Sequence, residues 1–288
     1  MMPFEFHPIE KVLLASMIFF FMFGIGAGLH FQDFKRCFQK PRYLILGLSC
    51  QYFIMPSLAL LVGMIFDLSL GARFVLLLIG CSPGGTSSNM FSFLSRADLS
   101  LSVTLTLISS LCAVFVTPLL IRITGQGAGL VIPYQNMFLT LIASLVPILF
   151  GMLIRIKKPQ WADLTENWAQ KGGLIIVLIM IILWIPKLWG LLTATDLPIF
   201  SAVALMGFAG MTIPMICLKL FQVPRAQVLT IGFETGIQNA PLAYAMIGLS
   251  FPAGSMVVES SWIALVYGAL SIGNGIVVLL ITKLKLRN

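Results

Sequence analysis

The side chains most able to do chemistry lie inside a long apolar stretch, IGFETGIQNAPLAYAMIGL, at residues 231–249. This stretch contains a carboxylate, Glu234, two amides, Gln238 and Asn239, a glycine and a proline. An ionisable group within hydrocarbon is costly and marks a functional site by default. Carboxylate, amide and freed backbone oxygens are ligands that hard cations prefer. The stretch therefore predicts a cation-binding site within a membrane-spanning segment.

Hydroxyl groups in two earlier stretches could complete such a site. In LSLSVTLTLISSL, Ser102 and Thr106 are four residues apart and share one helix face. Ser88 and Asn89 follow the GCSPGG stretch. Together with Glu234 they supply one formal negative charge, which favours a monovalent cation, because calcium sites gather more carboxylates. Each hydroxyl could instead bond to its preceding helical turn, and Glu234 could be a structural carboxylate bonded to a neighbouring helix.

The elements that must position these residues are membrane-spanning helices. The 288 residues are 59% hydrophobic and 10% charged, whereas about a quarter of a soluble domain is charged. Apolar runs of about twenty residues, enough to cross a bilayer, recur along the chain. We therefore expect an all-α membrane protein, in which residues 1–288 form a single polytopic membrane domain with nine transmembrane helices. The predicted spans cover about residues 11–30, 43–66, 72–95, 99–123, 134–156, 172–194, 198–221, 226–249 and 257–282.

Basic residues indicate how the chain is oriented, because cytoplasmic loops carry an excess of Lys and Arg. One side collects fourteen of them, Lys35, Arg36, Lys40, Arg42, Arg96, Arg155, Lys157, Lys158, Lys171, Lys219, Arg225, Lys283, Lys285 and Arg287. The other side collects four, Lys11, Arg73, Arg122 and Lys187. We expect a multi-pass protein of the cell membrane, with its N-terminus outside and its C-terminus in the cytoplasm. The net charge of +8 then needs no nucleic acid to explain it. The chain has no N-x-[ST] glycosylation acceptor, which slightly favours a bacterial inner membrane over a eukaryotic plasma membrane.

Two of the predicted spans are interrupted near their centres. The third contains Pro83 followed by two glycines, and the eighth contains Pro241. A proline displaces the carbonyl four residues earlier, so Pro83 should free the carbonyl of Ile79 and Pro241 that of Ile237. Non-helical backbone at membrane depth survives only within protein or beside a water-filled cavity. GCSPGG alone could be only a proline kink, and it lacks the Gly-Lys-Ser/Thr ending of a phosphate loop.

The positions of the two interruptions indicate an internal symmetry. The third and eighth spans are five crossings apart, so they run through the membrane in opposite directions. Paired broken helices in inverted positions are typical of the binding site of a secondary transporter. Spans one to four and six to nine would then be inverted repeats, with two broken helices crossing at the midplane. Half-helix ends meeting there would offer N–H groups to an anion and freed carbonyls to a cation.

Two long motifs, GCSPGGTSSNMFSFLSRADLSLSVTLT and FETGIQNAPLA, resemble those of the bile acid:sodium symporter family. The similarity extends to QYFIMP, VIPY, KKPQW and the KGG that follows it. Nine spans rather than ten resemble the animal liver and ileal bile acid cotransporters. The resemblance implies a core domain, formed by spans two to four and seven to nine, and a panel domain, formed by spans one, five and six. A crevice would separate the two domains.

The resemblance also implies two sodium sites that share one carboxylate. The implied ligands of the first site are Ser88, Asn89, Ser102, Thr106 and Glu234. Those of the second site are Gln51, Gln238, Glu234 and the backbone carbonyls near Thr235 and Ile237. The candidate substrate-binding residues, beside the crossing, are Thr86, Ser87, Asn239 and Ala240.

The expected function is import of an organic anion such as a bile acid, coupled to two Na⁺ ions by alternating access. Sulfated steroids and pantoate-like acids are alternative substrates, because family membership does not fix the substrate. A proton-coupled transporter would also use a lone carboxylate, but it would leave Gln51 and Gln238 without a role. We expect no enzyme, because the spans contain no His–Asp pair, HExxH motif or paired carboxylates. The expected partners are the organic anion and the lipid bilayer, with no nucleic acid and no obligate protein partner.

Overall fold

The computed structural model describes residues 7–39, 41–124, 131–193, 197–252 and 254–284. Within these ranges the chain is helical and contains no β-strand, in agreement with the predicted all-α class. The helices are α1 (Pro8–Gly28), α2 (Phe31–Gln39), α3 (Pro41–Ser49), the π-helix η1 (Cys50–Ile54), α4 (Met55–Ile65), α5 (Leu70–Gly80), α6 (Ser87–Leu94), α7 (Leu99–Thr124), α8 (Tyr134–Lys157), α9 (Pro159–Thr193), α10 (Leu197–Leu220), α11 (Arg225–Gly236), α12 (Ala240–Ser250), α13 (Met256–Glu259) and α14 (Trp262–Leu284). Three of the basic residues counted above, Lys40, Lys285 and Arg287, lie outside the described ranges.

The helices have the length and the surface of membrane-spanning segments. Among the described residues, six stretches are long and apolar enough to cross a membrane, namely Pro8–Gly28, Pro41–Ile65, Leu99–Thr124, Tyr134–Lys157, Leu197–Leu220 and Met256–Lys283. Large apolar side chains lie on the outside, such as Phe53 and Phe115, which are 72% and 69% exposed. Ser88, Ser102 and Thr106 are instead fully buried. An apolar exterior around a polar interior fits lipid as the solvent, and the chain is a multi-pass membrane protein.

The predicted third and eighth spans are each divided into two helices. α5 ends at Gly80 and α6 begins at Ser87, whereas α11 ends at Gly236 and α12 begins at Ala240. Pro241 occupies the first turn of α12, where its missing N–H removes no helical hydrogen bond. Each interrupted span therefore leaves short non-helical backbone inside the protein.

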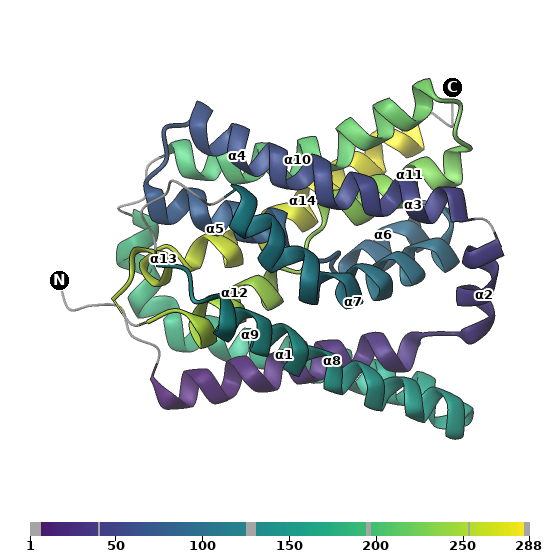
Figure 1. Ribbon diagram of the computed structural model, residues 1–288, viewed down its shortest axis with the longest axis horizontal. Coiled ribbons are helices and arrows are strands. Elements are labelled where there is room, and N and C mark those ends of the chain that lie inside the picture. The colour runs from purple at the N-terminus through teal and green to yellow at the C-terminus, as the bar shows by residue number, and fades with distance from the viewer. Residues whose placement is uncertain (1–6, 40, 125–130, 194–196, 253, 285–288) are drawn as a thin grey trace.

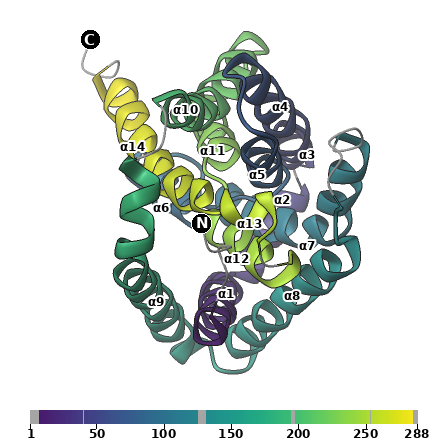
Figure 2. The ribbon, with the colours of Figure 1, turned by 90° about the vertical axis from the view of Figure 1, so that its left-hand side faces the viewer.

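Most helices run along the long axis of the molecule, with α1 beginning at the left of Figure 1 and α14 ending at the right. Figure 2, viewed from the left-hand end, shows α1, α8 and α9 at one side, with α3, α4, α10, α11 and α14 at the other. α1 packs against both α8 and α9, and contacts with α7 and α12 join this group to the remaining helices. Gly26 allows α1 to approach α8 closely, because a methyl group there would collide with the Ile148 backbone. Of the interrupted helices, α11 lies in the second group, whereas α12 contacts both α1 and α14.

Candidate functional site

The two broken helices meet through their non-helical segments. Gly84 and Gln238 form an antiparallel bridge, in which the Gly85 N–H donates to the Ile237 carbonyl at 2.8 Å and the Asn239 N–H to the Pro83 carbonyl at 2.9 Å. Backbone groups that lack helical partners are thus satisfied by the opposite segment. The freed carbonyls of one broken helix receive the N–H groups of the other.

One prediction about these segments is correct and one is wrong. The Ile237 carbonyl is free of its helix, as predicted from Pro241, and it accepts from Gly85. The Ile79 carbonyl is not free, because it accepts from the Ser82 N–H at 3.0 Å. α5 already ends at Gly80, so Pro83 lies beyond the helix in a turn that caps it. Pro83 therefore has no helical bond to interrupt.

Three helices bring the predicted ligands of the first sodium site together around Glu234. α6 contributes Ser88 and Asn89 from its first turn, α7 contributes Ser102 and Thr106 from one face, and α11 contributes Glu234 from its last turn. The carboxylate is 3% exposed. The hydroxyl of Ser88 donates to Oε2 at 2.5 Å and that of Thr106 to Oε1 at 2.5 Å, and the Ser102 hydroxyl lies 3.2 Å from Oε2.

Asn89 completes this cluster through the hydroxyl groups rather than through the carboxylate. Its Oδ1 atom accepts from the Ser102 hydroxyl at 2.8 Å and lies 3.4 Å from the Thr106 hydroxyl. The resulting group contains three hydroxyl oxygens, one amide oxygen and one carboxylate. The C-terminal end of α11 adds the partial negative charge of its helix dipole. This arrangement suits a desolvated monovalent cation.

A second polar group lies beside the bridge and includes Gln51 and Gln238. Gln51 lies in η1, and its Nε2 atom donates to the Ser82 carbonyl at 2.8 Å and to Gln238 Oε1 at 2.6 Å. The Gln238 Nε2 atom donates to the Thr235 carbonyl at 2.6 Å. Gln51 Oε1 is buried and has no hydrogen-bond partner among the described residues. An unsatisfied buried acceptor costs about 1–3 kcal/mol, so this oxygen is suited to bind a cation.

The second predicted sodium site is assembled only in part. Gln51, Gln238 and the Thr235 carbonyl are joined by the bonds just described. The Ile237 carbonyl already accepts from Gly85. The structure records no hydrogen bond from Glu234 to either glutamine among the described residues. Glu234 is thus bonded to residues of α6 and α7, whereas Gln51 is bonded to Gln238 of the bridge.

The four predicted substrate-binding residues lie at two helix N-termini. Thr86 occupies the N-cap position of α6 without a side-chain capping bond, Ser87 is the first residue of the helix, and both are half-buried. Asn239 caps α12, where its Oδ1 atom accepts from the Leu242 N–H at 3.1 Å, and Ala240 follows it. A helix N-terminus presents unpaired N–H groups and a partial positive charge. The bridge between Gly84 and Gln238 holds these two N-termini near each other.

A small cavity connects this region with the group of α1, α8 and α9. Its volume is about 30 Å³, and its lining includes Thr86 and Asn89 from α6 together with Gly28, Glu166 and Gln170 from α1 and α9. About one water molecule or a small ion fills such a volume. The polar groups of the crossing thus continue to the boundary between the two groups of helices.

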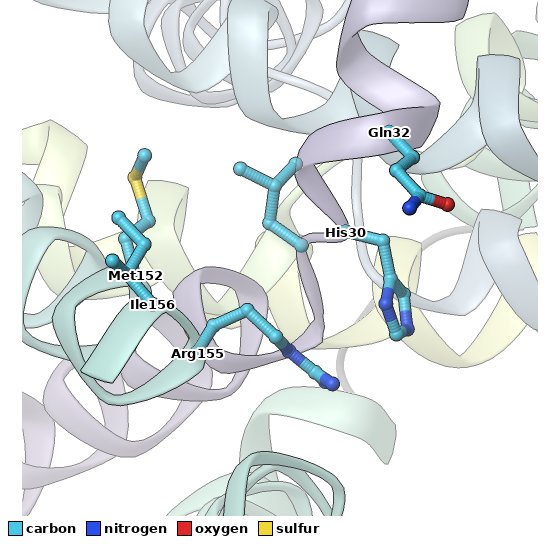
Figure 3. Close-up of a pocket in the computed structure, with 6 residues that line it drawn as sticks. His30, Gln32, Met152, Arg155 and Ile156 are labelled. Carbon is cyan, nitrogen blue, oxygen red and sulfur yellow. The ribbon is translucent and has the colours of Figure 1, made fainter. Parts of the chain in front are cut away.

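The cavity in Figure 3 lies away from the crossing. It has a volume of about 560 Å³, and its lining includes His30, Gln32, Met152, Arg155 and Ile156, from the α1–α2 junction and α8. The Arg155 guanidinium is already engaged, because Nε donates to the Ala27 carbonyl at 2.5 Å and Nη1 pairs with Asp163 at 2.6 Å. We therefore assign Arg155 a structural role, tying the end of α1 to α8 and α9.

Sequence reasoning missed three hydroxyl groups that hold the broken helices. Ser109 Oγ accepts from the Gly84 N–H at 3.2 Å, Thr117 Oγ1 donates to the Cys81 carbonyl at 2.6 Å, and the Tyr267 hydroxyl donates to the Gly236 carbonyl at 2.9 Å. Ser109 lies three residues after Thr106 on α7, so its helical spacing was an available signal. Tyr267 reaches the site only through tertiary packing.

Two broken helices that meet inside a membrane protein, with an oxygen-rich group around one carboxylate, are typical of a secondary transporter. Comparison with known proteins identifies the family, because residues 15–225 match the model of the Sodium Bile acid symporter family. The chain belongs to this family. It is therefore a membrane symporter of the sodium-coupled class and not an enzyme.

Three relatives illustrate the similarity. The human "Hepatic sodium/bile acid cotransporter" is 30% identical over 281 residues, covering 94% of this chain and 79% of the relative. The human "Ileal sodium/bile acid cotransporter" is 29% identical over 265 residues, covering 86% and 73%. The "Uncharacterized sodium-dependent transporter YocS" of Bacillus subtilis (strain 168) is 35% identical over 239 residues, covering 82% and 74%.

Proposed function

We propose that this symporter imports a bile acid or a similar organic anion together with two Na⁺ ions, by alternating access. The observation that carries the proposal is the buried carboxylate of Glu234 at the crossing, bonded by hydroxyls from α6 and α7. The names of the two human relatives support a bile acid as cargo. The Bacillus relative's name supports sodium dependence alone.

The two cations would lie on either side of the antiparallel bridge. The first would be held by Ser88, Asn89, Ser102, Thr106 and Glu234. The second would be held by Gln51, Gln238, Glu234 and the carbonyls of Thr235 and Ile237. The unpartnered Oε1 atom of Gln51 supports the second site, because a cation there would satisfy a buried acceptor.

The anionic group of the substrate would bind at the N-termini of α6 and α12. Thr86, Ser87, Asn239 and Ala240 would meet it through N–H, hydroxyl and amide groups. Two Na⁺ ions and one Glu234 carboxylate leave a net charge of +1 at the crossing. A monoanionic substrate neutralises this charge, which gives an electrostatic reason for interdependent binding.

Alternating access would take place between two domains. The panel would consist of α1, α8 and α9 (Figure 2), and the core would consist of spans two to four and seven to nine, which are α3 to α7, α10 to α12 and α14. The six long stretches, the two broken spans and α9 would make nine crossings that include inverted repeats. With the N-terminus outside, the turn between α8 and α9, which lies at the right of Figure 1, would face the cytoplasm. The boundary beside Thr86 and Asn89 would open and close as the core moves.

Uptake of labelled taurocholate into proteoliposomes, with sodium or potassium outside, tests the proposal. The wild type should accumulate taurocholate only in sodium, and Glu234→Ala should lose the sodium-dependent part. Asp163→Ala is the matched control, because it removes an exposed carboxylate that pairs only with Arg155 among the described residues. Equal wild-type uptake in both salts would contradict the symporter assignment.

The same preparation distinguishes the alternatives. A proton-coupled transporter would respond to an inward pH gradient without sodium. Competition of taurocholate uptake by a sulfated steroid or by pantoate ranks the substrate classes. If taurocholate were not taken up but pantoate uptake were driven by sodium, the proposed sodium coupling would stand and the proposed substrate would change from a bile acid to a pantoate-like acid.

A further inference from the structure

A groove with a basic rim lies on the outer side of the molecule, between α10, α11 and α14. These helices are neighbours in Figure 2, on the side away from α1 and α8. The groove has a volume of about 560 Å³. It is separate from the crossing and includes none of the proposed sodium or substrate ligands.

The body of the groove is apolar and faces the bilayer. Its walls include Met215 and Ile216 of α10 and Val278 and Ile281 of α14. Ile216 is 60% exposed and Ile281 is 43% exposed. Because this surface belongs to membrane-spanning helices, its natural solvent is an acyl chain rather than water.

The rim of the groove is positively charged. Lys219, in the last turn of α10, and Arg225, the first residue of α11, both line it. No Asp or Glu lines the groove, and neither basic residue forms an ion pair within the described part of the chain. Arg225 Nη2 lies 3.4 Å from the Thr282 carbonyl at the end of α14, which holds the guanidinium over the groove.

The spacing of these features matches a phospholipid. Thr212, another lining residue, precedes Lys219 by seven residues, so the groove extends roughly 10 Å along α10 from its basic rim. An acyl chain would lie along this length while the phosphate remained at the helix ends. A zwitterionic headgroup has an ammonium that would find no carboxylate in the groove. An anionic headgroup complements the two unpaired cations.

We propose that this groove binds an anionic phospholipid, with its phosphate between Lys219 and Arg225 and one acyl chain along α10 and α14. Arg, through its guanidinium, and Lys, through its ammonium, are the side chains that bind phosphate most effectively. The bound lipid would rest against Val228 and Leu229 of α11, the helix that carries Glu234 at its other end.

Native mass spectrometry of detergent-purified protein tests the proposal. Phosphatidylglycerol and phosphatidylcholine with identical acyl chains are titrated in parallel. The wild type should prefer phosphatidylglycerol by about tenfold or more, as two basic residues at a membrane surface allow. Lys219→Gln/Arg225→Gln should remove the preference. Lys157→Gln/Lys158→Gln, an equal loss of charge at the turn between α8 and α9, should keep it.

Equal binding of both lipids to the wild type, or equal losses in both double variants, would overturn the proposal. The single variant Lys219→Gln should fold normally, because this exposed side chain forms no hydrogen bond or ion pair with the described residues. It should weaken the preference for phosphatidylglycerol. Phosphatidylglycerol should also raise the wild-type Tm by about 3 °C relative to phosphatidylcholine. If soluble glycerol phosphate raised the Tm equally, the acyl groove would have no role and the lipid assignment would fall.

Discussion

The Glu234 carboxylate is surrounded by hydroxyl groups that have few protons to donate. Ser102 lies within hydrogen-bonding distance of both Glu234 and Asn89, and Thr106 likewise reaches both. Each hydroxyl carries one proton and two lone pairs. All these oxygens can direct lone pairs at a cation at the same time, whereas they cannot all be donors to one another. The same oxygens can therefore either bond to one another or serve together as ligands of the proposed cation.

Replacement of Thr106 by valine should weaken sodium coupling. Thr106→Val keeps the shape of the side chain but removes a hydroxyl that contacts Glu234 Oε1. In the proposed sodium site this oxygen is a ligand of the cation, and loss of a bond to a charged group costs about 1.5–3 kcal/mol, so the sodium concentration for half-maximal uptake should rise about tenfold or more. Sodium titration of taurocholate uptake measures this change.

Thr104 provides the matched control on the same helix. It is fully buried, and its hydroxyl donates to the Ser100 carbonyl at 2.7 Å rather than to the cluster. Thr104→Val should leave the sodium dependence unchanged. Equal effects of the two substitutions would show that α7 packing, and not the Glu234 contact, controls sodium affinity.

At the scale of elements, the two broken helices need a residue without a side chain at their closest approach. A methyl group on Gly84 would collide with the Glu234 carboxylate, and one on Gly85 would collide with the Gln238 backbone. Glycine therefore has a steric role at the crossing. The hydroxyls of Ser109 and Tyr267 add the bonds that the helix ends lack.

Gly84→Ala should abolish most sodium-dependent uptake. The added methyl would either displace Glu234 or separate the two bridged segments, and overpacking of this kind costs about 1–3 kcal/mol of stability. Uptake in sodium and the Tm of purified protein measure the two effects. Gly273→Ala on α14 is the control, because a methyl there meets no atom within 4 Å. Normal uptake by Gly84→Ala would contradict the proposed geometry of the sodium site.

At the scale of the whole molecule, the sequence predicts which residues form the site better than it predicts the backbone structure that holds them. Ser88, Ser102, Thr106 and Glu234 could be grouped because hydroxyl spacing and a lone membrane carboxylate are visible in the residues. The π-helix at Gln51 could not be predicted, since it depends on packing against other helices. π-Helices are rare and often occur at functional sites. For the same reason the prediction that the Ile79 carbonyl is free was wrong, because the residue at which α5 ends depends on tertiary contacts.

The proposed stoichiometry makes transport sensitive to membrane potential. Two Na⁺ ions and one monoanion carry a net charge of +1, and a potential of 100 mV, negative inside, contributes about 2.3 kcal/mol per charge. Taurocholate accumulation should therefore rise by up to about fiftyfold at equilibrium. Potassium diffusion potentials imposed with valinomycin test this, and reversal of the potential should lower accumulation. Uptake that ignored the potential would exclude two sodium ions per anion.

The antiparallel bridge between Gly84 and Gln238 also constrains the order in which the protein is made. About 150 residues separate its two segments along the chain. During synthesis the segment around Pro83 enters the membrane long before its partner exists, with backbone groups that lipid cannot satisfy. Biogenesis must therefore shelter the first half of the chain, in water or against other protein, until residues 237–239 arrive. The bonds that join the two broken helices are then among the later interior bonds to form.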